Sequence, residues 1–190
     1  TLDQVTRQAT RAGEVIKHIR TFVRKEEPER TMANINDVIK EALAFLKDDT
    51  ARKGIQIVQK LEPDLPPVMI DHIQVEQVIL NLFRNAIEAM EEYSSGPAKL
   101  DILTQRSEKG EIIVTVIDNG PGFTSDQDTM FDPFVTTKTN GLGLGLSISR
   151  SIVEAHGGRL QVSANQDNGA ALTFTLPIME NINMPTGGLR

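Results

Sequence analysis

The chain contains no cysteine and no tryptophan, and its other aromatic residues are few: one tyrosine and seven phenylalanines among 190 residues. Without cysteine, disulfide scaffolds, thiol catalysis, thiolate zinc sites and iron–sulfur clusters are excluded. The three histidines are scattered, which argues against a His-rich metal site. No apolar run approaches the roughly 20 residues of a membrane-spanning helix, and no signal peptide is visible.

The charge balance is acidic, with 20 Lys and Arg against 26 Asp and Glu and a net charge of −6. This balance argues against a nucleic-acid-binding domain, which normally carries a basic patch. The length fits one domain, or one domain with a short appendage. We therefore expect a chain with its own hydrophobic core, no nucleic acid partner and no membrane contact within these residues.

Residues 1–30 are predicted as a unit of their own, in which residues 1–27 form one helix that ends at Pro28. This helix carries a 3.5-residue repeat of aliphatic and small residues, which is typical of the seam of a helical bundle. The seam residues are Leu2, Val5, Ala9, Ala12, Ile16, Ile19 and Val23. One helix cannot bury such a seam alone, so we expect a homodimer through this helix, with the other helix of its hairpin before Thr1. Packing of the helix on the downstream domain is the alternative. On this interpretation the chain is a fragment, and whether the full-length protein is membrane-anchored stays open.

Residues 31–180 predict an α+β fold, a two-layer α/β sandwich with a mixed, mostly antiparallel sheet and helices on one face. Helices are predicted over 37–53, with Asn36 as N-cap and Gly54 as stop, over 72–93 with Asp71 as cap, and over 146–156. Strands are predicted over 55–61, 68–70, 100–105, 111–118, 159–164 and 171–177. Residues 181–190 predict a flexible tail.

Two glycine clusters bracket a long irregular stretch between residues 119 and 145. The first, Asp118–Phe123, follows an apolar strand, and the second, Gly141–Gly145, leads directly into a helix. Glycines before a helix N-terminus allow backbone N–H groups to surround an anion. The spacing is neither that of a P-loop nor that of a Rossmann fingerprint. The stretch predicts a phosphate-binding lid, although a turn without a ligand explains either cluster by itself.

Three amide side chains share one face of the helix predicted over 72–93. Gln77, Asn81 and Asn85 recur at every fourth residue. Such amides can hold a hydrated Mg²⁺, because that ion keeps several waters and takes few protein ligands. Arg84 beside them could reach a phosphate. A solvated helix face is the alternative explanation of this stripe.

Taken together, these segments resemble the nucleotide-binding boxes of the two-component sensor histidine kinases. The resemblance is carried by Gln77–Met90 (N box), Asp118–Gly122 (G1 box), Phe131–Phe134 (F box), Gly141–Gly145 (G2 box), and Gly169 with Leu172–Pro177. Residues 1–27 resemble the second helix of the dimerisation and histidine-phosphotransfer hairpin. Arg11–Arg30 and Thr137–Lys138 most resemble the FixL-like branch of PAS-containing oxygen-sensing and related kinases.

The resemblance implies the Bergerat ATP-binding fold that gyrase, Hsp90, histidine kinases and MutL share (GHKL). It implies that Asp118 accepts the adenine amino hydrogen, that Asn85 ligates Mg²⁺ and that Asn81 faces the nucleotide. Arg84 and Lys138 are the implied phosphate-neutralising cations and, with Asn81, the implied catalytic residues. The other implied ATP contacts are Gly120, Gly122, Phe134, Gly141, Leu142, Gly143, Leu144, Gly145, Leu146 and, through water, Thr173.

Two of the seven phenylalanines, Phe131 and Phe134, lie in the polar stretch between the glycine clusters. We interpret them as a hinge that packs the lid against the domain when ATP is bound. The alternative is that they are local core plugs.

Asn81 separates the possible reaction types. Gyrase-like and Hsp90-like ATPases resemble each other in having Glu at this position, as a base for water. An amide cannot take a proton from water at neutral pH, which favours transfer to a nucleophile brought from outside, expected to be a histidine. His18, His72 and His156 lack the family's phosphoacceptor pattern, so we expect the acceptor histidine on a helix before Thr1.

The predicted function is thus the ATP-binding catalytic domain of a cytoplasmic protein-histidine kinase, with onward transfer to an aspartate of a response regulator receiver domain. Three alternatives stay open: a gyrase- or MutL-type ATPase, a degenerate module that binds nucleotide without turnover, and a serine-kinase anti-sigma factor.

Overall fold

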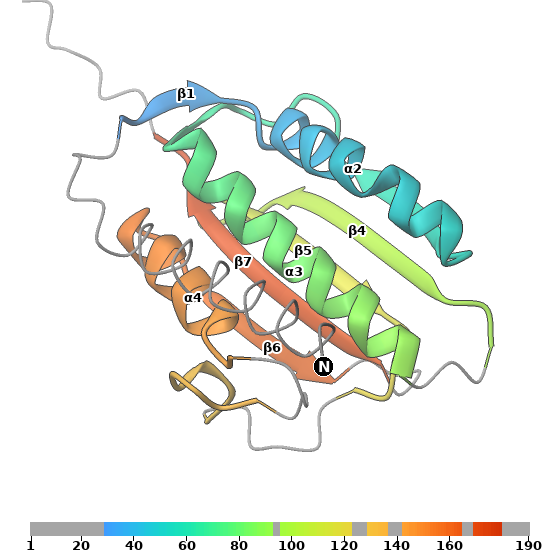
Figure 1. The fold of residues 1–190 in the computed structure, drawn as a ribbon. Coiled ribbons are helices and arrows are strands. Elements are labelled where there is room, and N and C mark those ends of the chain that lie inside the picture. The colour runs from blue at the N-terminus through green and yellow to red at the C-terminus, as the bar shows by residue number, and fades with distance from the viewer. Residues whose placement is uncertain (1–28, 93–95, 123–128, 137–141, 165–168, 180–190) are drawn as a thin grey trace, which may run out of the picture.

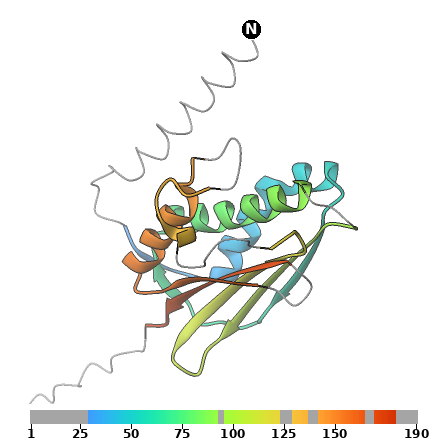
Figure 2. The same cartoon turned by 90° about the horizontal axis from the view of Figure 1, so that it is seen from below.

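The computed structural model describes residues 29–92, 96–122, 129–136, 142–164 and 169–179. They form two layers, one five-stranded sheet and a set of helices on one of its faces (Figures 1 and 2). In chain order the elements are β1 Thr31–Ala33, α2 Ile35–Arg52, β2 Gln56–Leu61, β3 Val68–Ile70, α3 His72–Glu92, β4 Lys99–Arg106, β5 Glu111–Asp118, the 3₁₀ helix η1 Thr129–Phe131, α4 Gly145–Ala155, β6 Leu160–Ala164 and β7 Ala170–Pro177.

The strand order of the large sheet is β2-β4-β5-β7-β6. Strands β2 and β4 pair in parallel, whereas the β4–β5, β5–β7 and β6–β7 pairs are antiparallel. The predicted sandwich with a mixed, mostly antiparallel sheet is therefore confirmed. Among the helices that the structure describes, none is long and apolar enough to cross a membrane.

Alternation along β5 decides which of its side chains reach the helical layer. Ile112, Val114 and Val116 are buried, and the residues between them are half-buried. Successive side chains of a strand point to opposite faces, so Asp118 continues the buried row. The carboxylate of Asp118 therefore lies at the end of a row of buried aliphatic side chains on β5.

Helix α2 begins two residues before the predicted start, because its N-cap is Asn34 and not Asn36. The side chain of Asn34 accepts a hydrogen bond from the backbone N–H of Asn36 at 2.9 Å. Asn36 lies inside the first turn, where its amide donates to the carbonyl of Glu62 and accepts from the hydroxyl of Thr104. The predicted cap was wrong because both asparagines suit a cap locally, and only the distant partners of Asn36 distinguish them.

Helix α3 begins after Asp71, whose Oδ1 accepts a hydrogen bond from the backbone N–H of Gln74 at 3.1 Å, as expected of its cap. Its apolar face enters the core and is at most 2% exposed at Val75, Val78, Ile79, Leu82, Phe83, Ala86, Ile87 and Met90. Helix α3 contacts α2 on one side and α4 on the other (Figure 1).

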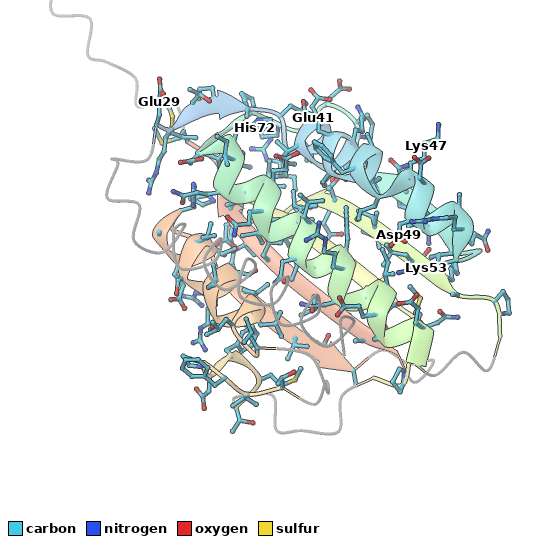
Figure 3. The ribbon with its side chains drawn as sticks, viewed as in Figure 1. Glu29, Glu41, Lys47, Asp49, Lys53 and His72 are labelled. Carbon is cyan, nitrogen blue, oxygen red and sulfur yellow. The ribbon has the colours of Figure 1, made fainter. Side chains whose placement is uncertain are left out.

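Ion pairs support the contact between α2 and α3 at the surface. Nε2 of His72 on α3 lies 2.7 Å from Oε2 of Glu41 on α2, and Lys53, the C-cap of α2, pairs with Glu91 of α3 at 3.0 Å. Lys53 also pairs with Asp49 of its own helix at 3.0 Å (Figure 3 labels all of these residues except Glu91). Exposed pairs of this kind each contribute less than about 1 kcal/mol. The apolar face of α3 therefore determines the packing.

Strand β1 was not predicted, and it pairs antiparallel with β3, with Met32 opposite Met69. Three residues are too few for alternation to reveal a strand. The helix predicted over 1–27 lies outside the described residues, as does the tail over 181–190. The division of the chain into these domains stays a prediction.

Candidate functional site

Asp118 is a carboxylate at the end of β5 that is only 3% exposed. Its Oδ1 accepts hydrogen bonds from the backbone N–H groups of Gly120 at 2.9 Å and Ala170 at 3.3 Å. Burial raises the pKa of Asp118 and outweighs the lowering by these two hydrogen bonds. A further hydrogen-bond donor would offset part of the cost of burying this charge, so the carboxylate suits a polar ligand group.

Gly120 brings the loop after β5 against α3. A Cβ atom at this position would lie 3.0 Å from Oδ1 of Asp118 and 3.4 Å from Cβ of Ala89. Gly122 follows with a φ of 73°, in the left-handed region that favours glycine. The two glycines of the G1 box therefore serve a close approach and a turn.

Asn119, which the sequence did not mark as a site residue, fastens this loop to the start of β4. Its Oδ1 accepts from the backbone N–H of Lys99 at 2.8 Å, and its Nδ2 donates to the carbonyl of Pro97 at 2.9 Å. Asn119 thus positions the loop that carries Asp118.

The predicted amide stripe lies on the half-buried face of α3 that leads toward Ala89. Gln77, Asn81 and Asn85 are all half-buried on it, while Arg84 beside them is exposed. Eight residues separate Asn81 from Ala89, about 12 Å of helix. Since Gly120 lies against Ala89, Asp118 is at one end of this face and Asn81 is about two turns away.

Helix α4 begins directly against Asn81. A Cβ atom at Gly145 would lie 2.5 Å from Oδ1 of Asn81, so only glycine fits without a shift. Farther along α4, the buried hydroxyl of Ser149 accepts a hydrogen bond from Nδ2 of Asn81 at 2.9 Å. Leu144, the N-cap of α4, makes no side-chain cap. The first backbone N–H groups of α4 therefore lie beside Asn81 without a side-chain acceptor from the cap residue.

Gly143 joins the G2 box to the F box. It has a φ of 66°, and a Cβ atom there would lie 2.6 Å from the carbonyl carbon of Phe134 and from the carbonyl oxygen of Val135. The backbone N–H of Phe134 donates to the carbonyl of Gly143 at 3.0 Å. The described parts of the glycine-bracketed stretch are thus packed against each other.

The two phenylalanines of the F box differ in their surroundings. Phe131 is 9% exposed, belongs to the core and lies beneath the guanidinium of Arg150, 5.2 Å from ring centroid to Cζ. Phe134 is 75% exposed and has a φ of 69°. Phe131 is therefore a core plug in this structure, and the joint hinge role of the pair stays a prediction.

Two implied phosphate contacts, Lys138 and Gly141, lie outside the described residues. Leu142, Leu144 and Leu146 are half-buried, and Leu146 packs against the core. Their contact with a nucleotide stays a prediction.

The structure contradicts the predicted ATP contact of Thr173. In β7 the buried neighbours Leu172 and Phe174 face the helical layer, so Thr173 points to the opposite face of the sheet. There its hydroxyl lies 3.1 Å from that of Thr115 on β5, and the two are hydrogen-bonded. The parity of the strand excludes Thr173 from the face that carries Asp118. The start of β7 reaches that carboxylate instead, through the N–H of Ala170.

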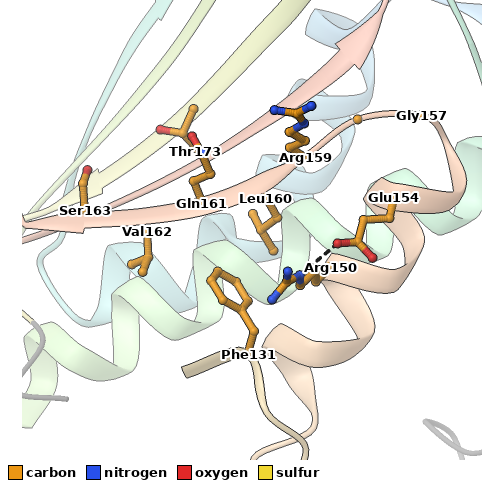
Figure 4. A pocket seen from close by; sticks show the side chains of 11 residues that line it. Phe131, Arg150, Glu154, Gly157, Arg159, Leu160, Gln161, Val162, Ser163 and Thr173 are labelled. Carbon is orange, nitrogen blue, oxygen red and sulfur yellow. Dashed lines mark hydrogen bonds and ion pairs between the residues drawn. The ribbon is translucent and has the colours of Figure 1, made fainter. Parts of the chain in front are cut away.

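A separate cavity of about 830 Å³ opens along β6, the edge strand (Figure 4). Arg150, Glu154 and Phe131 line it on the helical side, and Arg159 and Gln161 line it along the strand. Thr173 is the single implied ATP contact among the described residues that border it. This cavity is therefore distinct from the surface that joins Asp118 to Asn81.

Comparisons with known proteins agree with this fold. A family model described as "Histidine kinase-, DNA gyrase B-, and HSP90-like ATPase" matches residues 70–180. Among solved structures, the catalytic domain of the histidine kinase ThkA superposes with a TM-score of 0.69 at 32% identity, covering 78% of this chain and 95% of that one. ThkA in complex with the response regulator protein TrrA superposes with a TM-score of 0.76 at 28% identity, covering 92% and 49%.

Curated relatives are sensor proteins. FixL of Bradyrhizobium diazoefficiens is 41% identical over 177 residues, which cover 93% of this chain and 35% of FixL. TdiS of Thauera aromatica is 41% identical over 169 residues, covering 88% of this chain and 31% of TdiS. The chain thus spans about a third of the length of these relatives. It belongs to the histidine kinase-, gyrase B- and HSP90-like ATPase family, and it carries the ATP-binding catalytic domain of a sensor histidine kinase.

Proposed function

We propose that this domain binds ATP with Mg²⁺ across α3 and presents the γ-phosphate to a histidine side chain on a helix that precedes Thr1. The acceptor histidine would pass the phosphoryl group to an aspartate of a response regulator receiver domain. The observation that carries the reaction type is the amide of Asn81, which lies on α3 and faces the first turn of α4.

Asp118 is the proposed adenine-binding residue. Both hydrogen bonds from Gly120 and Ala170 end on Oδ1, so Oδ2 would accept the amino hydrogen of adenine. The raised pKa of the buried carboxyl supports this role, because burial makes its charge unfavourable and a further donor offsets part of that cost.

The phosphate end would lie near Asn81, where the N–H groups of α4 have no side-chain cap from Leu144. A helix N-terminus favours an anion through these N–H groups and the helix dipole. Exposed Arg84 would neutralise phosphate charge from α3, and we propose the same for Lys138 from the lid.

Asn85 is the proposed Mg²⁺ ligand. Among the described residues, no three His, Asp or Glu side chains are grouped to hold a metal. A hydrated Mg²⁺ needs no such group, because one protein oxygen together with phosphates and waters suffices. When bound, the ion would neutralise charge that develops on the phosphates.

Asn81 favours transfer over hydrolysis. Its amide cannot accept a proton from water, and its Nδ2 donates to Ser149. Asn81 therefore would position the nucleotide rather than activate water. Phosphoryl transfer depends mostly on positioning and charge stabilisation, which this surface can supply.

Neither histidine that the structure describes is placed as an acceptor. His156 is 4% exposed, and its ring nitrogens bond to the carbonyl of Ile152 and the backbone N–H of Asp71. His72 pairs with Glu41 on the α2–α3 surface. This supports an acceptor delivered by a separate element.

A transfer assay tests the proposal. The chain is mixed with a separate helix that bears the acceptor histidine, γ-labelled ATP and Mg²⁺, and the labelled residue is identified by mass spectrometry. Label on the histidine of the added helix is expected. Steady phosphate release without protein label would indicate a gyrase- or MutL-type ATPase, and failure to bind ATP at millimolar concentration would indicate a degenerate module.

The same proposal assigns the remaining parts of the chain. Residues 1–27 would form the second helix of a dimerising hairpin, and the receiver domain would dock on that helix. The location that fits ATP and a receiver domain is the cytoplasm.

A further inference from the structure

Ser149 lies in the middle of α4 and was not among the site residues that the sequence predicted. It is buried, with 2% of its surface exposed. A buried hydroxyl is unfavourable unless it is hydrogen-bonded. Its partner is Nδ2 of Asn81 at 2.9 Å, from a residue 68 positions earlier in the chain.

The neighbouring serines of α4 behave differently. Ser147 donates to the carbonyl of Leu144, and Ser151 donates to the carbonyl of Ser147, so both bond within their own helix. The Ser149 bond crosses from α4 to α3. In this bond the Nδ2 atom of the Asn81 amide donates to Ser149. The Oδ1 atom of the same amide lies against Gly145 at the start of α4.

A second hydrogen bond joins the C-terminal end of α4 to the residue that precedes α3. Nε2 of His156 accepts a hydrogen bond from the backbone N–H of Asp71 at 3.0 Å, just before α3 begins. Seven residues separate Ser149 from His156, about 10 Å of helix. This hydrogen bond does not involve Ser149. Loss of the Ser149 hydroxyl would therefore leave α4 in place and remove only the hydrogen bond that orients the amide of Asn81.

We propose that Ser149 is a positioning residue for phosphoryl transfer: its hydroxyl fixes the orientation of the Asn81 amide beside the phosphate-facing start of α4. The inference rests on the proposed function, in which Asn81 faces the nucleotide. Ser149 does not touch the nucleotide itself. Its removal therefore affects the alignment of the phosphate more than the affinity for ATP.

The test compares Ser149→Ala with Ser151→Ala, an exposed serine of the same helix, in the transfer assay at saturating ATP with Mg²⁺. We expect Ser149→Ala to slow histidine labelling about tenfold or more, because small misplacements of reacting groups have large effects on rate. The dissociation constant for ATP should stay within about threefold, because Ser149 does not contact the nucleotide and acts on the transferred phosphate only through Asn81. Ser151→Ala should match the wild type.

A double-mutant cycle separates positioning from a merely structural role. In an Asn81→Ala background, Ser149→Ala should have no further effect on the labelling rate. Ser149→Cys, which keeps the size of the side chain, should fall between the wild type and Ser149→Ala and serves as the comparison if Ser149→Ala does not fold.

Two results would overturn this inference alone: wild-type labelling by Ser149→Ala, or an equal loss of rate in both backgrounds. A wild-type chain that labels no histidine, or an Asn81→Ala variant that labels at the wild-type rate, would overturn the proposed roles and this inference with them.

Discussion

At Asp118, burial raises the pKa of the carboxyl group, whereas hydrogen bonds from the backbone lower it. Burial is the larger effect, and the pKa of Asp118 lies above its ordinary value of 3.8. A group whose pKa is raised by folding opposes folding when it ionises. Folding therefore buries an unfavourable charge at Asp118, which a further hydrogen-bond donor can offset.

Asp118→Asn tests this charge through stability. Asn keeps an oxygen that accepts from Gly120 and Ala170. The wild type loses stability as the pH rises through the unfolded pKa of 3.8 and the higher folded pKa, whereas the variant does not. We expect the variant's excess free energy of unfolding to grow from about pH 4 toward neutrality. Urea denaturation at several pH values measures it, and an excess that shrinks with pH would contradict the assignment.

The same substitution should weaken ATP binding by about 10- to 100-fold, because a hydrogen bond to a charged group contributes about 1.5–3 kcal/mol. Titration calorimetry measures the affinity. Asp48→Asn, an exposed carboxyl on α2, is the matched control. Unchanged affinity in Asp118→Asn would remove Asp118 from the adenine site.

Asn85→Ala should lower Mg²⁺-dependent histidine labelling by about 100-fold, the scale of losing one group that stabilises transition-state charge. Its free energy of unfolding should change by less than about 1 kcal/mol, because the residue is half-buried on a helix where alanine is favourable. Gln77→Ala, on the same face two turns earlier, is the control. If Asn85→Ala labels histidine as fast as the control Gln77→Ala, Asn85 is not a ligand of the ion.

Among the elements, α4 is located by contacts at both ends. Asn81 and Ser149 meet near its start, and His156 bonds to Asp71 at its end. Gly158 after α4 leaves no room for a Cβ atom beside the carbonyl of Thr175 on β7. These contacts fix the distance between the G2 glycines and the amide stripe of α3.

Gly145→Ala tests the fit between α4 and Asn81. Alanine in a helix is favoured over glycine by about 1 kcal/mol, but its Cβ would lie 2.5 Å from Oδ1 of Asn81. We expect little net change in the free energy of unfolding and about a tenfold loss of transfer rate, because Asn81 moves. Gly96→Ala, where a Cβ meets nothing within 4 Å, is the control.

Packing of η1 on α4 depends on Phe131. Phe131→Ala should lower the free energy of unfolding by about 3 kcal/mol through lost burial and a residual cavity. Arg150→Ala removes the cation above that ring and an exposed pair with Glu154, and should cost about 1 kcal/mol or less. Denaturant titration of both variants measures the difference, and equal losses would mean that the cation governs the contact.

At the scale of the whole molecule, the core that the described residues form runs from Ile35 to Leu176 and includes helices and strands from both ends of this part of the chain. A chain that starts at residue 29 should therefore unfold cooperatively, with a midpoint close to that of the full chain. It should also keep its affinity for ATP. A large drop in the urea midpoint would favour the alternative that residues 1–28 pack on this domain.

The net charge of −6 does not prevent binding of a polyanion in this proposal. Arg84 and the backbone N–H groups at the start of α4 would act locally, and charges beyond about 8–10 Å are screened at physiological salt. Raising the ionic strength should therefore weaken ATP binding only modestly.

Much of the fold followed from local patterns. The core face of α3 and the strands β4, β5, β6 and β7 have the predicted type and nearly the predicted bounds. These elements are long enough for the spacing of their apolar residues to reveal a helix or a strand, whereas the three residues of β1 are not. The errors at Asn36 and Thr173 have another origin, because each depends on partners far away in the chain.

The sequence by itself determined the order of helices and strands apart from β1 and η1, the glycine-bracketed stretch and the boxes that point to ATP, because these are local patterns of burial and backbone freedom. Only the tertiary structure decided that Thr173 faces away from Asp118, that Phe131 is a core residue while Phe134 is exposed, and that Ser149 holds Asn81. Strand register and the contact of two helices join residues tens of positions apart, and no local pattern encodes which of them meet.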